Sequence, residues 1–160
     1  MTARELMTER PATVSPRTTL AEAWDLMREL DVRHMPVVER GTVIGMVSDR
    51  DLGNFDVVRV LAEEGEASLR RRLELPVSTI MSTDVAAAQP ELEMLDIVAL
   101  LLERRVGAVP VVSAGTQELL GIVSYVDVLR AMAAELEAVE EIRRQRPGAR
   151  RSRPSGRRSR

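Results

Sequence analysis

The sequence contains two copies of one unit, and this internal repeat restricts the possible folds more than any other feature. Under a shift of 74 positions, residues of the first half fall on identical residues of the second, among them Met7, Pro16, Leu26, Glu29, Val32, Pro36, Val37 and Val38 on Met81, Pro90, Leu100, Glu103, Val106, Pro110, Val111 and Val112. Beyond Gly41 the shift becomes 76, and four more identities follow: Gly45, Val47, Ser48 and Asp51 on Gly121, Val123, Ser124 and Asp127. The two extra residues fall at a predicted turn, where an insertion costs little.

Each copy predicts the same order of elements: an extended start, a helix, two strands and a second helix. Pro16 and Pro90 end the extended starts. Apolar residues at helical spacing predict the first helix of each copy: Leu20, Ala23, Trp24, Met27 and Leu30, then Met94, Ile97, Val98 and Leu101. We expect Trp24 in the core or at a packing surface between modules. Two β-rich runs on either side of Gly41 predict a hairpin, which residues 108–113 and 119–124 repeat.

The second helix is predicted to begin at Ser48 and again at Ser124. Its later copy carries apolar residues on one face: Val128, Leu129, Met132, Leu136 and Val139. We assign residues 1–64 to the first unit, 65–75 to a linker whose helical character stays open, 76–134 to the second unit, and 135–160 to a helix end with an arginine-rich tail. Since a unit of this size has a small core of its own, the two should pack into one α+β module.

Composition excludes several classes of catalytic site. The sequence has no cysteine, which excludes disulfides, thiolate zinc sites and cysteine nucleophiles. It has one histidine, His34, which argues against histidine-based metal sites and catalytic triads. It also has no Walker-type phosphate loop and no dinucleotide fingerprint in the required strand context. We therefore expect a binding protein that needs no metal and is not an enzyme. No leader opens the sequence, and no apolar run approaches the roughly 18 residues of a membrane helix, so we expect a cytoplasmic protein.

Charge is distributed unevenly along the chain. All 23 basic residues are arginines, and nine of them lie in residues 143–160, which contain no acid. Residues 1–142 therefore hold 14 arginines against 25 acids, a net charge of −11. The tail is rich in Arg, Ser, Pro and Gly, so we expect it to be disordered. One interpretation is a tail that serves solubility or degradation, or that has no role. The other is an electrostatic contact for nucleic acid, acidic protein or anionic lipid, or for the acidic body of the chain itself.

The stretch GMVSDRD, residues 45–51, predicts a strand that ends at a helix start. Ser48 and Asp51 have the spacing of a capping box, in which a hydroxyl caps the first turn and an acid three residues later answers it. An exposed helix start is also an anion site, because its N–H groups are unpaired and carry partial positive charge. Ser124 and Asp127 repeat the pair. The residues alone leave both interpretations open.

Residues 7–52 and 81–129, each with a Gly-x-x-Ser-x-x-Asp motif near its end, resemble the cystathionine-β-synthase (CBS) domain pair, also called a Bateman module. The resemblance extends over roughly residues 3–134. It implies two pseudo-symmetric βαββα units packed through their sheets, with clefts between them. Such pairs commonly bind adenosine-containing ligands (AMP, ADP, ATP or S-adenosylmethionine), many dimerise, and they regulate other proteins. The implied partners are a second copy of the chain and an unknown regulated protein.

The resemblance also implies ligand-binding roles for particular residues. In the first motif Ser48 would contact phosphate and Asp51 both ribose hydroxyls, since a carboxylate offers two acceptor oxygens. The implied set is Thr13, Val14, Arg33, His34, Met35, Pro36, Ser48, Arg50 and Asp51 in the first motif, and Ala87, Val109, Pro110, Ser124 and Asp127 in the second. The alternatives are a solvated arginine for Arg50, a structural histidine for His34, and ordinary core for Met35 and Val109.

The two sites are expected to differ in charge. Arg33 and His34 precede a predicted strand in the first copy, where the second copy has Gly107 and Ala108. Because guanidinium groups match phosphate oxygens, we expect a charged phosphate in the first cleft and a less anionic ligand, or none, in the second. The leading hypothesis is a stand-alone regulatory module that binds an adenosine-containing ligand and signals in trans. The alternative is a dimeric scaffold or nucleic-acid-associated protein that acts through its arginine-rich tail.

Overall fold

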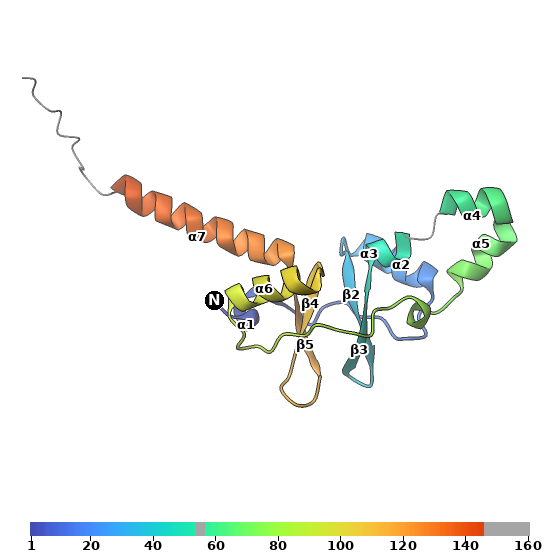
Figure 1. Cartoon of the computed structure of the whole chain (residues 1–160), viewed down its shortest axis with the longest axis horizontal. Coiled ribbons are helices and arrows are strands. Elements are labelled where there is room, and N and C mark those ends of the chain that lie inside the picture. Colours follow the sequence, from blue (N-terminus) through green and yellow to red (C-terminus); the bar gives the residue numbers. More distant parts are fainter. Residues whose placement is uncertain (54–56, 146–160) are drawn as a thin grey trace, which may run out of the picture.

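Both predicted hairpins are present in the computed structural model, which describes residues 1–53 and 57–145. β2 (His34–Glu39) pairs antiparallel with β3 (Thr42–Ser48), and β4 (Ala108–Val112) pairs antiparallel with β5 (Leu119–Ser124). Each hairpin has a register shift at the same place in the repeat, between Val37 and Val38 and between Val111 and Val112. Figure 1 shows the two hairpins side by side in the middle of the molecule. The mixed fold of two repeats is therefore confirmed.

Helices surround the two hairpins and extend beyond them. In chain order the remaining elements are α1 (Ala3–Leu6), β1 (Thr8–Glu9), α2 (Leu20–Glu29), α3 (Asp49–Gly53), α4 (Val57–Glu64), α5 (Glu66–Leu73), the 3-10 turn η1 (Val77–Thr79), α6 (Met94–Arg104) and α7 (Tyr125–Gln145). The predicted linker thus contains α5, which packs beside α4. Figure 1 shows α4 and α5 at one end of the molecule, and α7 extending outward from the opposite end.

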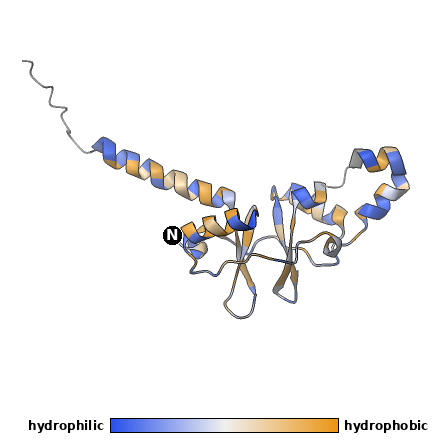
Figure 2. Ribbon diagram, viewed as in Figure 1, coloured by the Kyte–Doolittle hydropathy of each residue, from blue (hydrophilic) through white to orange (hydrophobic). Residues whose placement is uncertain are grey.

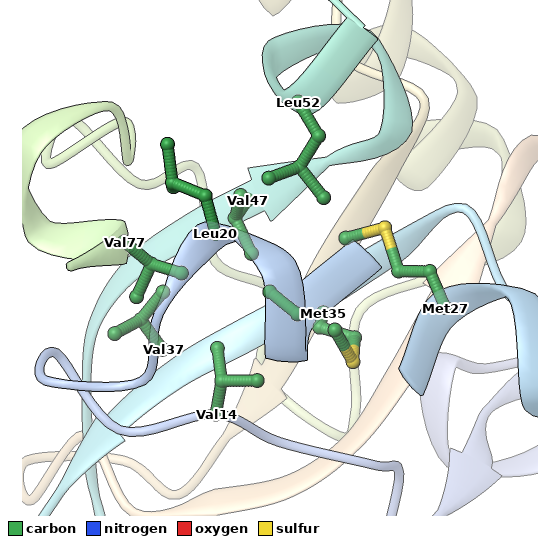
Figure 3. Close-up of a cluster of buried hydrophobic side chains, with 9 residues drawn as sticks. Val14, Leu20, Met27, Met35, Val37, Val47, Leu52 and Val77 are labelled. Carbon is green, nitrogen blue, oxygen red and sulfur yellow. The ribbon is translucent and has the colours of Figure 1, made fainter. Parts of the chain in front are cut away.

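The first core lies between α2 and the β2–β3 hairpin. Its members are Val14, Leu20, Ala23, Met27, Met35, Val37, Val47, Leu52 and Val77, most of them labelled in Figure 3. Thr19 caps α2 through a reciprocal capping box with Glu22, which fixes the helix start and turns the apolar face of α2 inward. Trp24 is 38% exposed and lies outside the core, so of its two expected places the core is wrong and a packing surface between modules stays a prediction.

The second core repeats this arrangement between α6 and the β4–β5 hairpin. It comprises Ala3, Ala88, Ile97, Leu101, Val109, Val111, Val123 and Val128. Like the first core it is aliphatic, as the aromatic content of 2% requires. The two hairpins also touch at their turns, where the Val43 N–H donates to the Gln117 carbonyl at 3.1 Å.

The two units exchange their first segments. β1, from the start of the first repeat, pairs with β5 of the second, with Thr8 opposite Ile122. Ser82, which corresponds to Thr8, forms the equivalent bridge with Met46 of β3. In the same way Ala3 lies in the second core and Val77 in the first. The cores therefore cross the boundaries at residues 64 and 76 that the repeat suggests, and those boundaries stay a prediction.

The exchange explains the glycine of each Gly-x-x-Ser-x-x-Asp motif. A β-carbon on Gly45 would lie 2.7 Å from Sδ of Met81, and one on Gly121 would lie 2.5 Å from Sδ of Met7. The β-carbon on Gly121 would also lie 2.9 Å from the backbone oxygen of Thr8. Because real β-carbons do not approach so closely, a side chain here would push the exchanged segment off the sheet.

Candidate functional site

The pair Ser48 and Asp51 forms a complete helix cap. The Ser48 N–H and hydroxyl both donate to Oδ2 of Asp51, at 2.8 and 2.6 Å, and the Asp51 N–H donates back to Oγ of Ser48 at 3.2 Å. Ser124 and Asp127 repeat the three bonds at 2.8, 2.6 and 3.4 Å. Within residues 1–53 and 57–145, Oδ1 of Asp51 accepts no hydrogen bond, so the carboxylate keeps one oxygen available.

A cavity of about 280 Å³ opens at the first cap. Its walls come from both units. The end of β3 and the start of α3 contribute Ser48, Asp49, Arg50 and Asp51, the extended start of the second repeat contributes Ser82, Asp84, Val85 and Ala86, and the chain entering β4 contributes residues 105–108. Arg33, His34, Met46, Val47 and Tyr125 complete the lining. The cavity combines the capped start of α3 with three carboxylates, from Asp49, Asp51 and Asp84, and three arginines, from Arg33, Arg50 and Arg105. Together these groups suit a ligand that has both hydroxyl groups and negative charge.

A second cavity of about 390 Å³ opens at the other cap. Ser124, Tyr125, Val126, Asp127 and Arg130 line it from β5 and α7, and Thr8, Pro11 and Ala12 from the extended start of the first repeat. Asp31, Val32, Arg33, His34, Ala108 and Ile122 close it. The two cavities are related by the repeat, since residues 82–86 correspond to residues 8–12. Both volumes are near the lower end of the range for small-molecule sites.

Arg33 and His34 line both cavities, which the sequence did not predict. The imidazole of His34 lies against Gly107, where a β-carbon would come within 2.5 Å of Nε2. Gly107 occupies the position of Arg33 in the repeat, so its missing side chain makes room for the histidine of the other unit. Arg130 adds a further charge to the second cavity, where its Nη1 lies 4.0 Å from Oδ1 of Asp127. The expected difference in charge between the cavities is therefore smaller than Gly107 and Ala108 suggested.

The environment of His34 disfavours its protonated form. Burial lowers the pKa of the imidazole below its ordinary value, and Arg50 and Arg33 lower it further. Asp49 and Asp51 act in the opposite direction without overcoming burial. His34 is therefore neutral at pH 7, and an anion bound beside it would favour proton uptake.

Several residues of the implied set lie outside both cavities. Met35, Pro36, Val109 and Pro110 are buried in β2 and β4, and Val14 lies in the first core. Thr13 is exposed and Ala87 half-buried, and neither lines a cavity described above. The structure brings together Arg33, His34, Ser48, Arg50 and Asp51 at the first cap, and Ser124 and Asp127 at the second. The ligand-binding role of the whole set stays a prediction.

Sequence reasoning missed the segments 8–12 and 82–86 because it assigned each extended start to the cleft of its own repeat. Tyr125, Arg105 and Arg130 were also missed, and the sequence carries no motif for them. In the part of the chain that the structure describes, no cluster of three or more His, Cys, Asp or Glu residues is placed to hold a metal. No helix there is long and apolar enough to cross a membrane. Most of the predicted disordered tail, residues 146–160, lies outside the described residues.

Comparison with known proteins gives the same two units. The sequence profile of the CBS domain matches residues 3–55 and 77–134. The chain is 33% identical over 125 residues to the CBS domain-containing protein YhcV of Bacillus subtilis, an alignment that covers 78% of this chain and 81% of that protein. Two further curated relatives are longer, and the chain covers 48% and 42% of their lengths.

Two solved structures show the same arrangement. The AcuB protein of Vibrio cholerae is 31% identical and superposes with a TM-score of 0.69, covering 88% of this chain and 96% of that one. CBSX2, whose structure is a complex with AMP, is 28% identical with a TM-score of 0.69, covering 85% and 98% of the two chains.

Proposed function

The chain belongs to the CBS domain family, and from this premise we propose that it is a regulatory module that binds an adenosine-containing ligand in the two cavities between its units. The candidates are AMP, ADP, ATP and S-adenosylmethionine. AMP stands first because CBSX2 was crystallised with it and because the first cavity carries Arg33, Arg50 and Arg105. A phosphate there would meet guanidinium groups, whose geometry matches its oxygens.

One observation carries this proposal: a capping carboxylate with an unused oxygen forms part of the wall of a cavity. Thr19 and Glu22 form an equivalent capping box at the start of α2, with bonds of 2.8, 3.0 and 3.2 Å, but neither lines a described cavity. Ser48–Asp51 and Ser124–Asp127 therefore differ from an ordinary cap in where they lie. We assign Asp51 and Asp127 to ligand hydroxyls and the arginines to phosphate.

The test compares variants that remove the same cap inside and outside the cavities. Wild type, Asp51→Asn, Asp127→Asn and Glu22→Gln are melted with and without AMP, ADP, ATP and S-adenosylmethionine at millimolar concentration. A ligand at 100 times its Kd stabilises the folded protein by about 2.7 kcal/mol. We expect a ligand-dependent rise in Tm for wild type and for Glu22→Gln, and a smaller rise for each single Asp variant. The double variant, which combines Asp51→Asn with Asp127→Asn, should show no rise.

Two results would contradict the proposal. One is the absence of a shift with all four ligands in wild type. The other is a shift that Glu22→Gln reduces as strongly as Asp51→Asn does, because the carboxylate would then act only through helix stability.

Signalling follows from occupancy if the ligand prefers one arrangement of the two units. We propose that the output reaches a separate protein. We further propose a homodimer, a binding role without catalysis, and a cytoplasmic location. The tail as a contact for nucleic acid stays a prediction, tested by nucleic-acid retention at low salt after truncation at Ile142.

A further inference from the structure

An apolar stripe runs along α7 and is uncovered. Its members recur at spacings of four and three residues: Tyr125, Leu129, Met132, Leu136 and Val139, which are 43%, 57%, 41%, 64% and 47% exposed. Figure 2 shows hydrophobic and hydrophilic residues mixed along this helix, which extends away from both sheets. The two-unit fold does not require the stripe, because Gly53 corresponds to Leu129 and is the last residue of α3. This spacing is typical of a helix that packs against another helix.

We propose that α7 pairs antiparallel with α7 of a second copy of the chain, which gives the homodimer of the proposed function a specific interface. From Leu129 to Val139 the stripe has spacings of three, four and three, so this part reads the same in both directions. Ile142, which is 58% exposed, lies beside the stripe rather than on it. In antiparallel register Leu129 meets Val139 of the second copy, and Met132 meets Leu136. Each contact then occurs twice about a two-fold axis, as a closed dimer requires.

Charge decides against the parallel alternative. Glu135 and Glu140 flank the stripe, and a parallel pair would set Glu135 of each helix against Glu140 of the other, two like-charge contacts. It would also align the four glutamates of residues 135–141 with the same four of the second copy. The antiparallel pair instead places them along residues 127–133, which hold one acid, Asp127, and one base, Arg130. Beside the stripe it leaves one like-charge contact, Glu135 with its own copy.

The end of the stripe also finds a partner in this register. Arg143 of the second copy lies over Tyr125, where a guanidinium and an aromatic ring attract each other. Tyr125 lines both cavities. The dimer contact would therefore reach the wall of the ligand sites, and the partner helix would help to set the shape of the cavities.

The absence of cysteine permits a clean cross-linking test. Met132→Cys and Leu136→Cys proteins are oxidised separately and after mixing and re-equilibration, with Ala134→Cys, on the opposite face, as the control. The antiparallel pair predicts a disulfide dimer between Met132→Cys and Leu136→Cys chains only in the mixture. Cross-linking of either variant alone at the same yield indicates a parallel pair and overturns the proposal.

Light scattering on the full chain separates the interface from the dimer itself. We expect wild type and Ala138→Glu at twice 17.8 kDa and Leu136→Glu at 17.8 kDa, with circular dichroism to show that Leu136→Glu keeps its helices. A wild-type monomer at tens of micromolar overturns both the pairing and the homodimer. A Leu136→Glu dimer overturns the pairing alone. Ligand binding is scored separately by the AMP-dependent Tm, so its failure is distinguishable from either result.

Discussion

The imidazole of His34 fills the space that a side chain on Gly107 would take, with Nε2 only 2.5 Å from the position of a β-carbon there. His34 comes from the first unit and Gly107 from the second, at adjacent positions of the repeat. The contact holds the histidine between the two cavities and accounts for its burial. It also explains why the second repeat has no basic residue at this place.

Gly107→Ala should release His34 into solvent. The new methyl group meets the tip of a side chain that can rotate away, so we expect the imidazole to move and the fold to persist. Its pKa should then rise toward the ordinary value of about 6.5. Because His34 is the single histidine of the sequence, an NMR titration follows one imidazole signal. Equal pKa values in wild type and variant would contradict this contact.

The stability of the protein should fall between pH 7 and pH 5 because of His34. A base whose pKa is lower in the folded state binds fewer protons there, so acid favours the unfolded chain. The penalty is absent well above the unfolded pKa of about 6.5 and grows as the pH falls through that value toward the folded pKa. Urea unfolding at pH 7 and pH 5 should show a smaller loss for His34→Gln than for wild type. A loss of the same size in both would exclude His34 as the cause.

Gly121→Ala should destabilise the fold more than Gly107→Ala does. Here the β-carbon meets the backbone oxygen of Thr8 at 2.9 Å as well as the side chain of Met7, and a paired backbone cannot rotate away. We expect a loss of about 1–3 kcal/mol, as for overpacked cores, measured by urea unfolding. Gly53→Ala is the matched control, since no described atom lies within 4 Å of its β-carbon. Comparable losses in the two variants would argue against the exchanged pairing of β1.

Arg33→Ala should weaken AMP binding in both cavities, whereas Arg50→Ala should weaken it only in the first. Asp127→Asn isolates the first cavity and Asp51→Asn the second, and calorimetry measures each arginine variant in both backgrounds. Loss of a hydrogen bond to a charged group costs about 1.5–3 kcal/mol, or roughly 10–150-fold in Kd. An Arg33→Ala effect confined to one background would show that the arginine serves one cavity.

Local sequence predicted most of the elements whose cause is local. The short α1 was missed, although Thr2 and Glu5 form a capping box at its start. The hairpin at Gly41 forms because glycine adopts the required positive φ of 82°. Ser48 and Asp51 cap a helix because their spacing lets each side chain reach the backbone of the other. The helix over residues 66–73 was left open, since Gly65 gave no clear start; it begins directly after that glycine, which has a φ of 83°.

Residues 3–9 and 76–82 show what the sequence could not decide. The repeat itself fixed two units, their order of strands and helices, and the two caps, because periodicity, turn chemistry and capping act over a few residues. It could not say which unit each extended start would join, since the two repeats offer either segment a similar apolar strand edge. Only the packed structure, in which Gly45 and Gly121 admit the segment of the other repeat, decided that pairing. That pairing also determines which residues line the two cavities, including Arg33 and His34, which line both.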